Sequence, residues 1–147
     1  FLLFITNCKT KEIASPVNIE DEFVNQQIKI RFDNYSNTFK TSDPISLELK
    51  YNSNNVIVFP NNYNLKIFEL SDDNWLEIQE KPPVRLPEGD VVLDPNIKLP
   101  AVEVIFVSPH IKDLSQSHKL RIYVIGEMQT GNGNQNVAAY VDVLLKP

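Results

Sequence analysis

The chain is predicted to fold as an all-β domain made of two packed antiparallel sheets. Apolar residues recur at every second position in QIKIRFD (residues 27–33) and ISLELKY (45–51), the pattern of a strand that is buried on one face only. The 10 prolines recur at the ends of such segments and leave no room for a long helix. A length of 147 residues suits one domain with a single core. A closed barrel is the alternative arrangement.

Further short apolar segments, separated by turn-forming residues, complete the expected set of strands. A helix is expected for no more than a turn, near HIKDLS (110–115). After the two segments above, the expected strands are residues 56–59, 65–70, 75–79, 91–93, 102–107, 120–128 and 137–145.

Charge and cysteine content exclude several classes of protein. A net charge of -5 with scattered Lys and Arg argues against nucleic acid as a partner, because phosphate binding requires a dense cationic surface. A single cysteine forms neither an intrachain disulfide nor a thiolate zinc site. Stability is therefore expected to come from packing and hydrogen bonds.

The first eight residues, FLLFITNC, resemble the end of a bacterial lipoprotein signal, in which a cysteine that receives a lipid follows a short apolar stretch. Ile5 and Thr6 match this lipobox, and Asn7 stands where Gly, Ala or Ser is usual. The resemblance implies that residues 1–7 are the remnant of a signal peptide, Cys8 is lipidated and residues 8–22 form a tether. The alternative makes FLLFI a buried edge strand and Cys8 an inert small apolar residue.

Two further segments carry a resemblance to bacterial immunoglobulin-like domains. VVLDPN (91–96) followed by VEVIFV (102–107) is similar to a strand, a proline-containing turn and the next strand of such domains. LKIFELSDDNWLEI (65–78) resembles their hairpin with a tryptophan, also found in small bacterial proteinase inhibitors. The resemblance implies an immunoglobulin-like sandwich of about seven to nine strands within residues 23–147, with Trp75 in its core. It carries over no catalytic residues.

Candidate sites for catalysis or metal binding are better explained as loops and turns. SPHIKDLSQSH (108–118) brings Ser108, His110, Asp113 and His118 together in sequence, but it lacks a nucleophile elbow and the helical spacing of zinc ligands. Asp72, Asp73 and Asn74 are typical of a hairpin turn and lack the spacing of a calcium loop. TGNGNQN (130–136) reads as a hairpin tip. We therefore expect no metal, no cofactor and no enzymatic activity.

The final hairpin offers the one candidate binding surface. Asn132-Gly133 is the preferred pair for a two-residue type I′ turn, which would place Met128 opposite Val137 and Gly126 opposite Ala139. One face would then be apolar throughout. The other would carry a mixed polar and aromatic set, with the two tyrosines as diagonal neighbours, and this set is the candidate surface: Arg121, Tyr123, Ile125, Tyr140 and Asp142.

These observations predict a non-catalytic, extracytoplasmic lipoprotein domain that serves recognition or structural support at the bacterial cell envelope. Its expected partners are the membrane, through the lipid anchor, and an unidentified envelope protein or glycan. Two alternatives remain open at this point. A proteinase inhibitor would use the proline-rich loop 80–90, and a carbohydrate-binding module would use exposed aromatic rings such as Trp75.

Overall fold

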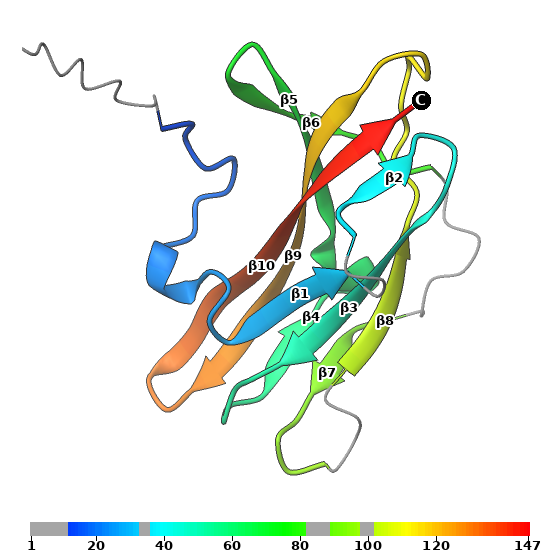
Figure 1. Cartoon of the computed structure of the whole chain (residues 1–147). Helices are drawn as coiled ribbons and strands as arrows, with labels where there is room; N and C mark the ends of the chain where they lie inside the picture. Colours follow the sequence, from blue (N-terminus) through cyan, green and yellow to red (C-terminus); the bar gives the residue numbers. More distant parts are fainter. Residues whose placement is uncertain (1–11, 33–35, 82–88, 98–101) are drawn as a thin grey trace, which may run out of the picture.

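The computed structural model describes residues 12–32, 36–81, 89–97 and 102–147, and in these residues the chain is all-β (Figure 1). It contains ten strands and two short 3₁₀ helices, Asp21–Phe23 (η1) and Asn61–Asn64 (η2). Residues 110–117, where a helical turn was expected, form a loop with a turn at Leu114 and Ser115. The strands form two separate sheets rather than a closed barrel within the described part of the chain.

The smaller sheet has three strands in the order β1 (Ile28–Phe32), β3 (Ile45–Tyr51) and β8 (Val102–Val107). Both of its pairs are antiparallel. In β3, alternate residues Ile45, Leu47 and Leu49 are buried, as the period of two in ISLELKY predicts. This sheet therefore turns one face toward the core.

The larger sheet is built around the hairpin of β9 (His118–Thr130) and β10 (Gly133–Lys146), the two longest strands in Figure 1. β10 continues to β2 (Thr38–Lys40), while the other edge of β9 is shared by two neighbours. Near its end β9 pairs with β4 (Ile57–Phe59), which leads to β7 (Val91–Leu93); near its start it pairs with β5 (Lys66–Ser71), which leads to β6 (Asn74–Ile78).

The strand count and one strand direction differ from expectation. The described residues contain ten strands rather than about seven to nine, and the strand among them that the sequence did not reveal is β2. β2 has three residues with Phe39 as its only apolar side chain, too short for an alternating pattern. It pairs with β10 in parallel, whereas the pairs between all the other strands are antiparallel.

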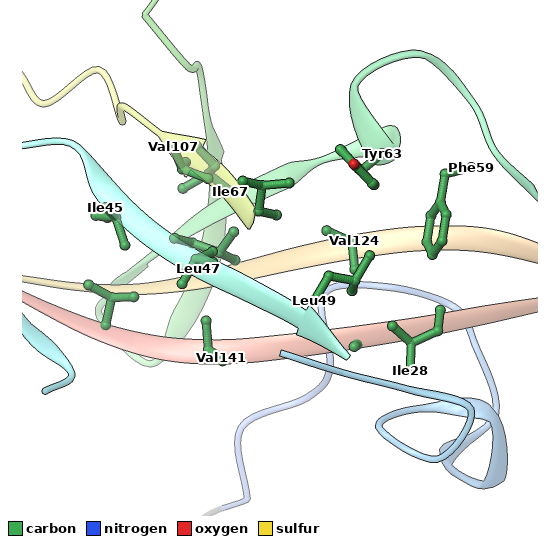
Figure 2. Close-up of a cluster of buried hydrophobic side chains, with 14 of the residues drawn as sticks. Ile28, Ile45, Leu47, Leu49, Phe59, Tyr63, Ile67, Val107, Val124 and Val141 are labelled. Atoms are coloured by element: carbon green, nitrogen blue, oxygen red, sulfur yellow. The ribbon is translucent and has the colours of Figure 1, made fainter. Parts of the chain in front are cut away.

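A single apolar core lies between the two sheets. Figure 2 shows Leu47 and Leu49 of the smaller sheet directed toward Val124 and Val141 of the hairpin. Alternate residues of β9 and β10 supply the largest share of this core, and all of them are buried: Leu120, Ile122, Val124, Gly126, Met128, Val137, Ala139, Val141, Val143 and Leu145. The prediction of one wholly apolar face for this hairpin is confirmed.

The register of the same hairpin differs from the prediction by two residues. Thr130 pairs with Gly133, so Gly131 and Asn132 are the turn residues, and Val137 lies opposite Gly126 rather than Met128. The positive φ falls on Gly133, at 122°, the residue after the turn. A shift of two residues keeps every side chain on its face, so the apolar pattern fits both registers equally well and the turn decides between them.

Gly126 allows the core to pack closely against the centre of β9. A Cβ atom at this position would lie 2.8 Å from Ile57 Cγ2 and 2.9 Å from Phe59 Cε1. Both neighbours are fully buried side chains of β4. Glycine is therefore required here by the close approach of β4 and not by a turn.

Candidate functional site

The candidate site is the face of the β9–β10 hairpin that points away from the core, called the outer face below. It carries all five residues of the predicted surface. Arg121 lies directly opposite Asp142, Tyr123 opposite Tyr140, and Ile125 opposite Ala138. The two tyrosines are therefore direct cross-strand neighbours and not the diagonal neighbours that the predicted register required.

An ion pair and two aromatic rings fix Arg121 in place. Its Nε donates to Asp142 Oδ1 at 2.7 Å and its Nη2 donates to Asp142 Oδ2 at 2.9 Å. The guanidinium carbon lies 4.6 Å from the ring centroid of Trp75 and 4.2 Å from that of Tyr140. The hydrogen bonds to Asp142 raise the pKa of Arg121 above its usual value, so the side chain is cationic throughout the physiological range.

A second apolar cluster surrounds this ion pair. Phe68 of β5 and Tyr123 meet edge to face, with ring centroids 5.9 Å apart, and Tyr123 and Tyr140 are 5.1 Å apart. Trp75 of β6 packs against this cluster and not in the core between the sheets. Its indole Nε1 is buried and has no hydrogen-bond partner among the described residues. The outer face is thus apolar at its centre, and Tyr123 is only 1 % exposed.

The chain before β1 covers much of this outer face. Figure 1 shows the segment, in blue, beside β10 on the side away from β1 and β3. Val17, Ile19 and Val24 pack against the second cluster, and the hydroxyls of Ser15 and Tyr123 are 3.4 Å apart. Part of the segment expected to be a tether, residues 8–22, therefore lies against the sheet.

Two pockets remain between this segment and the sheet. One has a volume of about 280 Å³ and is lined by Arg121, Tyr123 and Tyr140 on the sheet and by residues 12–15, Asp21 and Val24 on the segment. The other, of about 350 Å³, lies between residues 12–16 and residues 73–75. The covering segment therefore does not fill the space above the outer face.

The histidine-containing loop does not assemble a metal site or a catalytic triad. Among the described residues, no three His, Cys, Asp or Glu side chains are grouped so that they could hold a metal ion. His118 Nδ1 lies 2.5 Å from Glu69 Oε1, and its Nε2 lies 2.6 Å from the carbonyl oxygen of Asp113. Partial burial alone would lower the pKa of His118, but these two acceptors outweigh it and the pKa is raised.

Residues of β8 form an exposed apolar surface that the sequence prediction did not include. Val104 is 51 % exposed and Phe106 68 % exposed, while their neighbours Ile105 and Val107 are buried. The sequence VEVIFV could have revealed this surface, because residues 104–107 are apolar at both odd and even positions, which point to opposite faces of a strand. A strand that is buried on one face needs apolar residues at one parity only.

Several predicted features lie outside the described residues. They are Cys8, with the lipobox, and residues 82–88 of the loop considered for a proteinase inhibitor. Within the described ranges, no helix has the length and apolar character needed to cross a bilayer.

The fold and the outer face define an all-β, two-sheet domain with a partly covered cluster of aromatic residues around an ion pair. No protein-family model matches the chain, and no curated protein matches it. A solved structure described as "AvmM Catalyzes Macrocyclization in Alchivemycin A Biosynthesis" is similar at 16% sequence identity, covering 90% of this chain and 97% of that chain, with a TM-score of 0.34. At this TM-score, the likeness carries no argument about fold or activity.

Proposed function

We propose that the chain is a membrane-tethered, extracytoplasmic recognition domain with an immunoglobulin-like sandwich and no catalytic activity. The outer face is its binding site, and an envelope protein is its partner. Lipidation of Cys8 holds the domain at the membrane. The observation that carries the proposal is the cluster of Arg121, Tyr123 and Tyr140 beside an open pocket of about 280 Å³.

The chemistry of this pocket suits a protein partner. Arginine, tyrosine and tryptophan are the residues that contribute most to binding at protein interfaces, because they supply a large rigid area and directional hydrogen bonds. Arg121 and Tyr140 of this pocket and Trp75 of the neighbouring pocket are all partly exposed, so a partner could contact them. Arg121 is held in advance by Asp142, which reduces the entropy lost on binding.

A glycan is a less suitable partner for the same residues. Sugars bind to aromatic side chains by stacking on the open face of a ring. Here the Arg121 guanidinium lies over both Trp75 and Tyr140. A sugar would have to displace an arginine that is bonded to Asp142 through two hydrogen bonds, whereas a protein segment could lie beside it.

The anchor is tested by fractionating cells that produce the full-length protein or its Cys8→Ser variant. The wild-type protein is expected in the membrane fraction and the variant in the soluble extracytoplasmic fraction, because several acyl chains hold a protein firmly and the serine accepts none. Membrane association of the variant, or a free Cys8 thiol in the wild type, would show that the anchor is not a lipid at this cysteine.

The binding face is tested with Tyr140→Ala, a change at a half-buried ring on the edge of the cluster. We expect this variant to retain the wild-type melting temperature within a few degrees and to capture less of the native partner from solubilised envelopes. Leu76→Ala is the matched control, since Leu76 is 54 % exposed and lies on β6. Equal capture by all three proteins would exclude the outer face as the binding site.

A further inference from the structure

We propose that residues 12–22 are an exchangeable cover, and that the outer face binds, in place of this cover, an extended segment of a partner protein. The partner segment carries two apolar side chains at positions two residues apart. This inference rests on the proposed recognition function, and it names the chemistry of the partner.

The cover itself shows what the outer face accepts. Val17 and Ile19 pack against the cluster of Phe68, Tyr123 and Ala138. Asn18, which lies between them in the sequence, and Glu20, which follows them, are exposed. Two apolar residues separated by one polar residue thus place both side chains on the sheet. A partner segment with the same spacing in an extended conformation can make the same contacts.

The cover is held by side chains, whereas the residues after it are held by the backbone. Val24 forms a parallel bridge with Ala138, the Asn25 N–H donates to the Ala138 carbonyl at 2.9 Å, and the Tyr140 N–H donates to Asn25 Oδ1 at 2.9 Å. No such backbone bond joins residues 12–22 to the sheet in the described part of the chain. The cover can therefore leave while Val24 and Asn25 stay in place.

Incomplete packing also favours exchange. Two pockets of about 280 and 350 Å³ that are open to solvent lie along the cover, so the cover leaves part of the outer face uncontacted. A segment with larger side chains would fill this space and make contacts that the cover does not make. The partner would then displace the cover through a difference in affinity for the same face.

The experiment uses the full chain and a synthetic peptide of residues 12–22, EIASPVNIEDE, as the probe. Trp75 is the only tryptophan of the chain and borders one of the pockets along the cover, so its fluorescence reports on occupancy of the outer face. In the variant Val17→Asp with Ile19→Asp, the cover should leave the outer face, because keeping it in place would bury two unpaired charges. This variant should bind the peptide at least about tenfold more tightly than wild type, whose own cover competes.

Two controls make the result specific. Val92→Asp with Leu114→Asp places the same charges on apolar side chains that are 51 % and 53 % exposed, and this protein should bind the peptide as weakly as wild type. A peptide with Asp at the positions of Val17 and Ile19 should not bind to any of the proteins.

Each other outcome overturns the proposal. If the Val17→Asp, Ile19→Asp chain is unfolded, and Val17→Ala alone lowers the unfolding midpoint as a core substitution would, the cover is an integral part of the fold. If the double variant is folded but binds no peptide, or binds it no better than wild type does, the face is not exchangeable. Neither result depends on the fractionation of Cys8→Ser, which tests the anchor separately.

Discussion

Arg121 and Asp142 lie directly opposite each other on β9 and β10 and are joined by two parallel hydrogen bonds. The smaller sheet contains a second directly opposite pair, Arg31 and Glu48, whose side chains are 52% and 19% exposed, against 17% for Arg121 and 37% for Asp142. Arg121 donates to Asp142 through two nitrogen atoms, whereas Arg31 donates to Glu48 through Nε. The two pairs therefore allow a two-point contact of a buried guanidinium to be compared with a one-point contact of an exposed guanidinium within one protein.

Double-mutant cycles to alanine should give a larger coupling energy for Arg121–Asp142 than for Arg31–Glu48. We expect about 1 kcal/mol or more for the first pair, because its two-point geometry is fixed and water has limited access. For the more exposed pair we expect about 0.5 kcal/mol or less. The measurement is the free energy of unfolding in urea for each single and double variant. Equal couplings would show that the outer face is as well hydrated as the exposed surface of the smaller sheet.

Gly126→Ala should destabilise the protein by about 1–3 kcal/mol, because the added methyl group would overlap with Ile57 and Phe59 of β4. Gly131→Ala is the matched control, since no atom lies within 4 Å of a Cβ at that position. Its effect on the unfolding free energy should stay within about 0.5 kcal/mol. Similar effects of the two substitutions would mean that β4 does not approach β9 as closely as described.

Stability should decline as the pH rises from about 6.5, because His118 is held between two acceptors and its pKa is raised in the folded state. A histidine with a raised pKa stabilises the fold fully below its unfolded pKa and loses this contribution as the pH passes through the folded pKa. Urea unfolding between about pH 6 and about pH 8.5 measures the decline. His118→Asn should remove it and Glu69→Gln should reduce it; an unchanged slope in His118→Asn would assign the effect to another group.

Asp73→Gly should stabilise the β5–β6 hairpin. Its turn residues Asp72 and Asp73 both have positive φ, 48° and 62°, which costs free energy for any residue except glycine. We expect a gain of up to about 1 kcal/mol in unfolding free energy, measured by thermal or urea unfolding, because relief of the left-handed conformation exceeds the extra backbone entropy that glycine loses on folding. Gly133→Ala, at φ 122°, should act in the opposite direction. A destabilised Asp73→Gly protein would show that the Asp73 side chain contributes more to the turn than its backbone conformation costs.

Alternating apolar residues in two segments, and short apolar runs bounded by turn-forming residues elsewhere, located nine of the ten strands in the described residues. The apolar pattern could not distinguish the two registers of the final hairpin, because they place the same side chains on the same faces. The choice depends on which pair in Gly131-Asn132-Gly133 forms the turn, and local preference favoured the pair that the structure does not use.

The five residues of the outer face were predicted together because they occupy alternate positions on neighbouring strands. The burial of Tyr123 was not predictable in the same way. It depends on Val17 and Ile19, which lie more than a hundred residues earlier in a mostly polar segment. Such a contact between distant segments leaves no periodic signal in the segment that makes it.

The central position of the β9–β10 hairpin in the larger sheet also determines when this protein can fold during its synthesis. β2, β4 and β5 and the segment around Val24 all pair with strands formed by residues 118–146. A ribosome makes those residues after every other described strand of this sheet, so the earlier strands must wait for their partners. Until β9 and β10 have emerged, the apolar faces of the earlier strands remain exposed. A newly made chain therefore has to avoid wrong pairing of these strands until β10 has been synthesised.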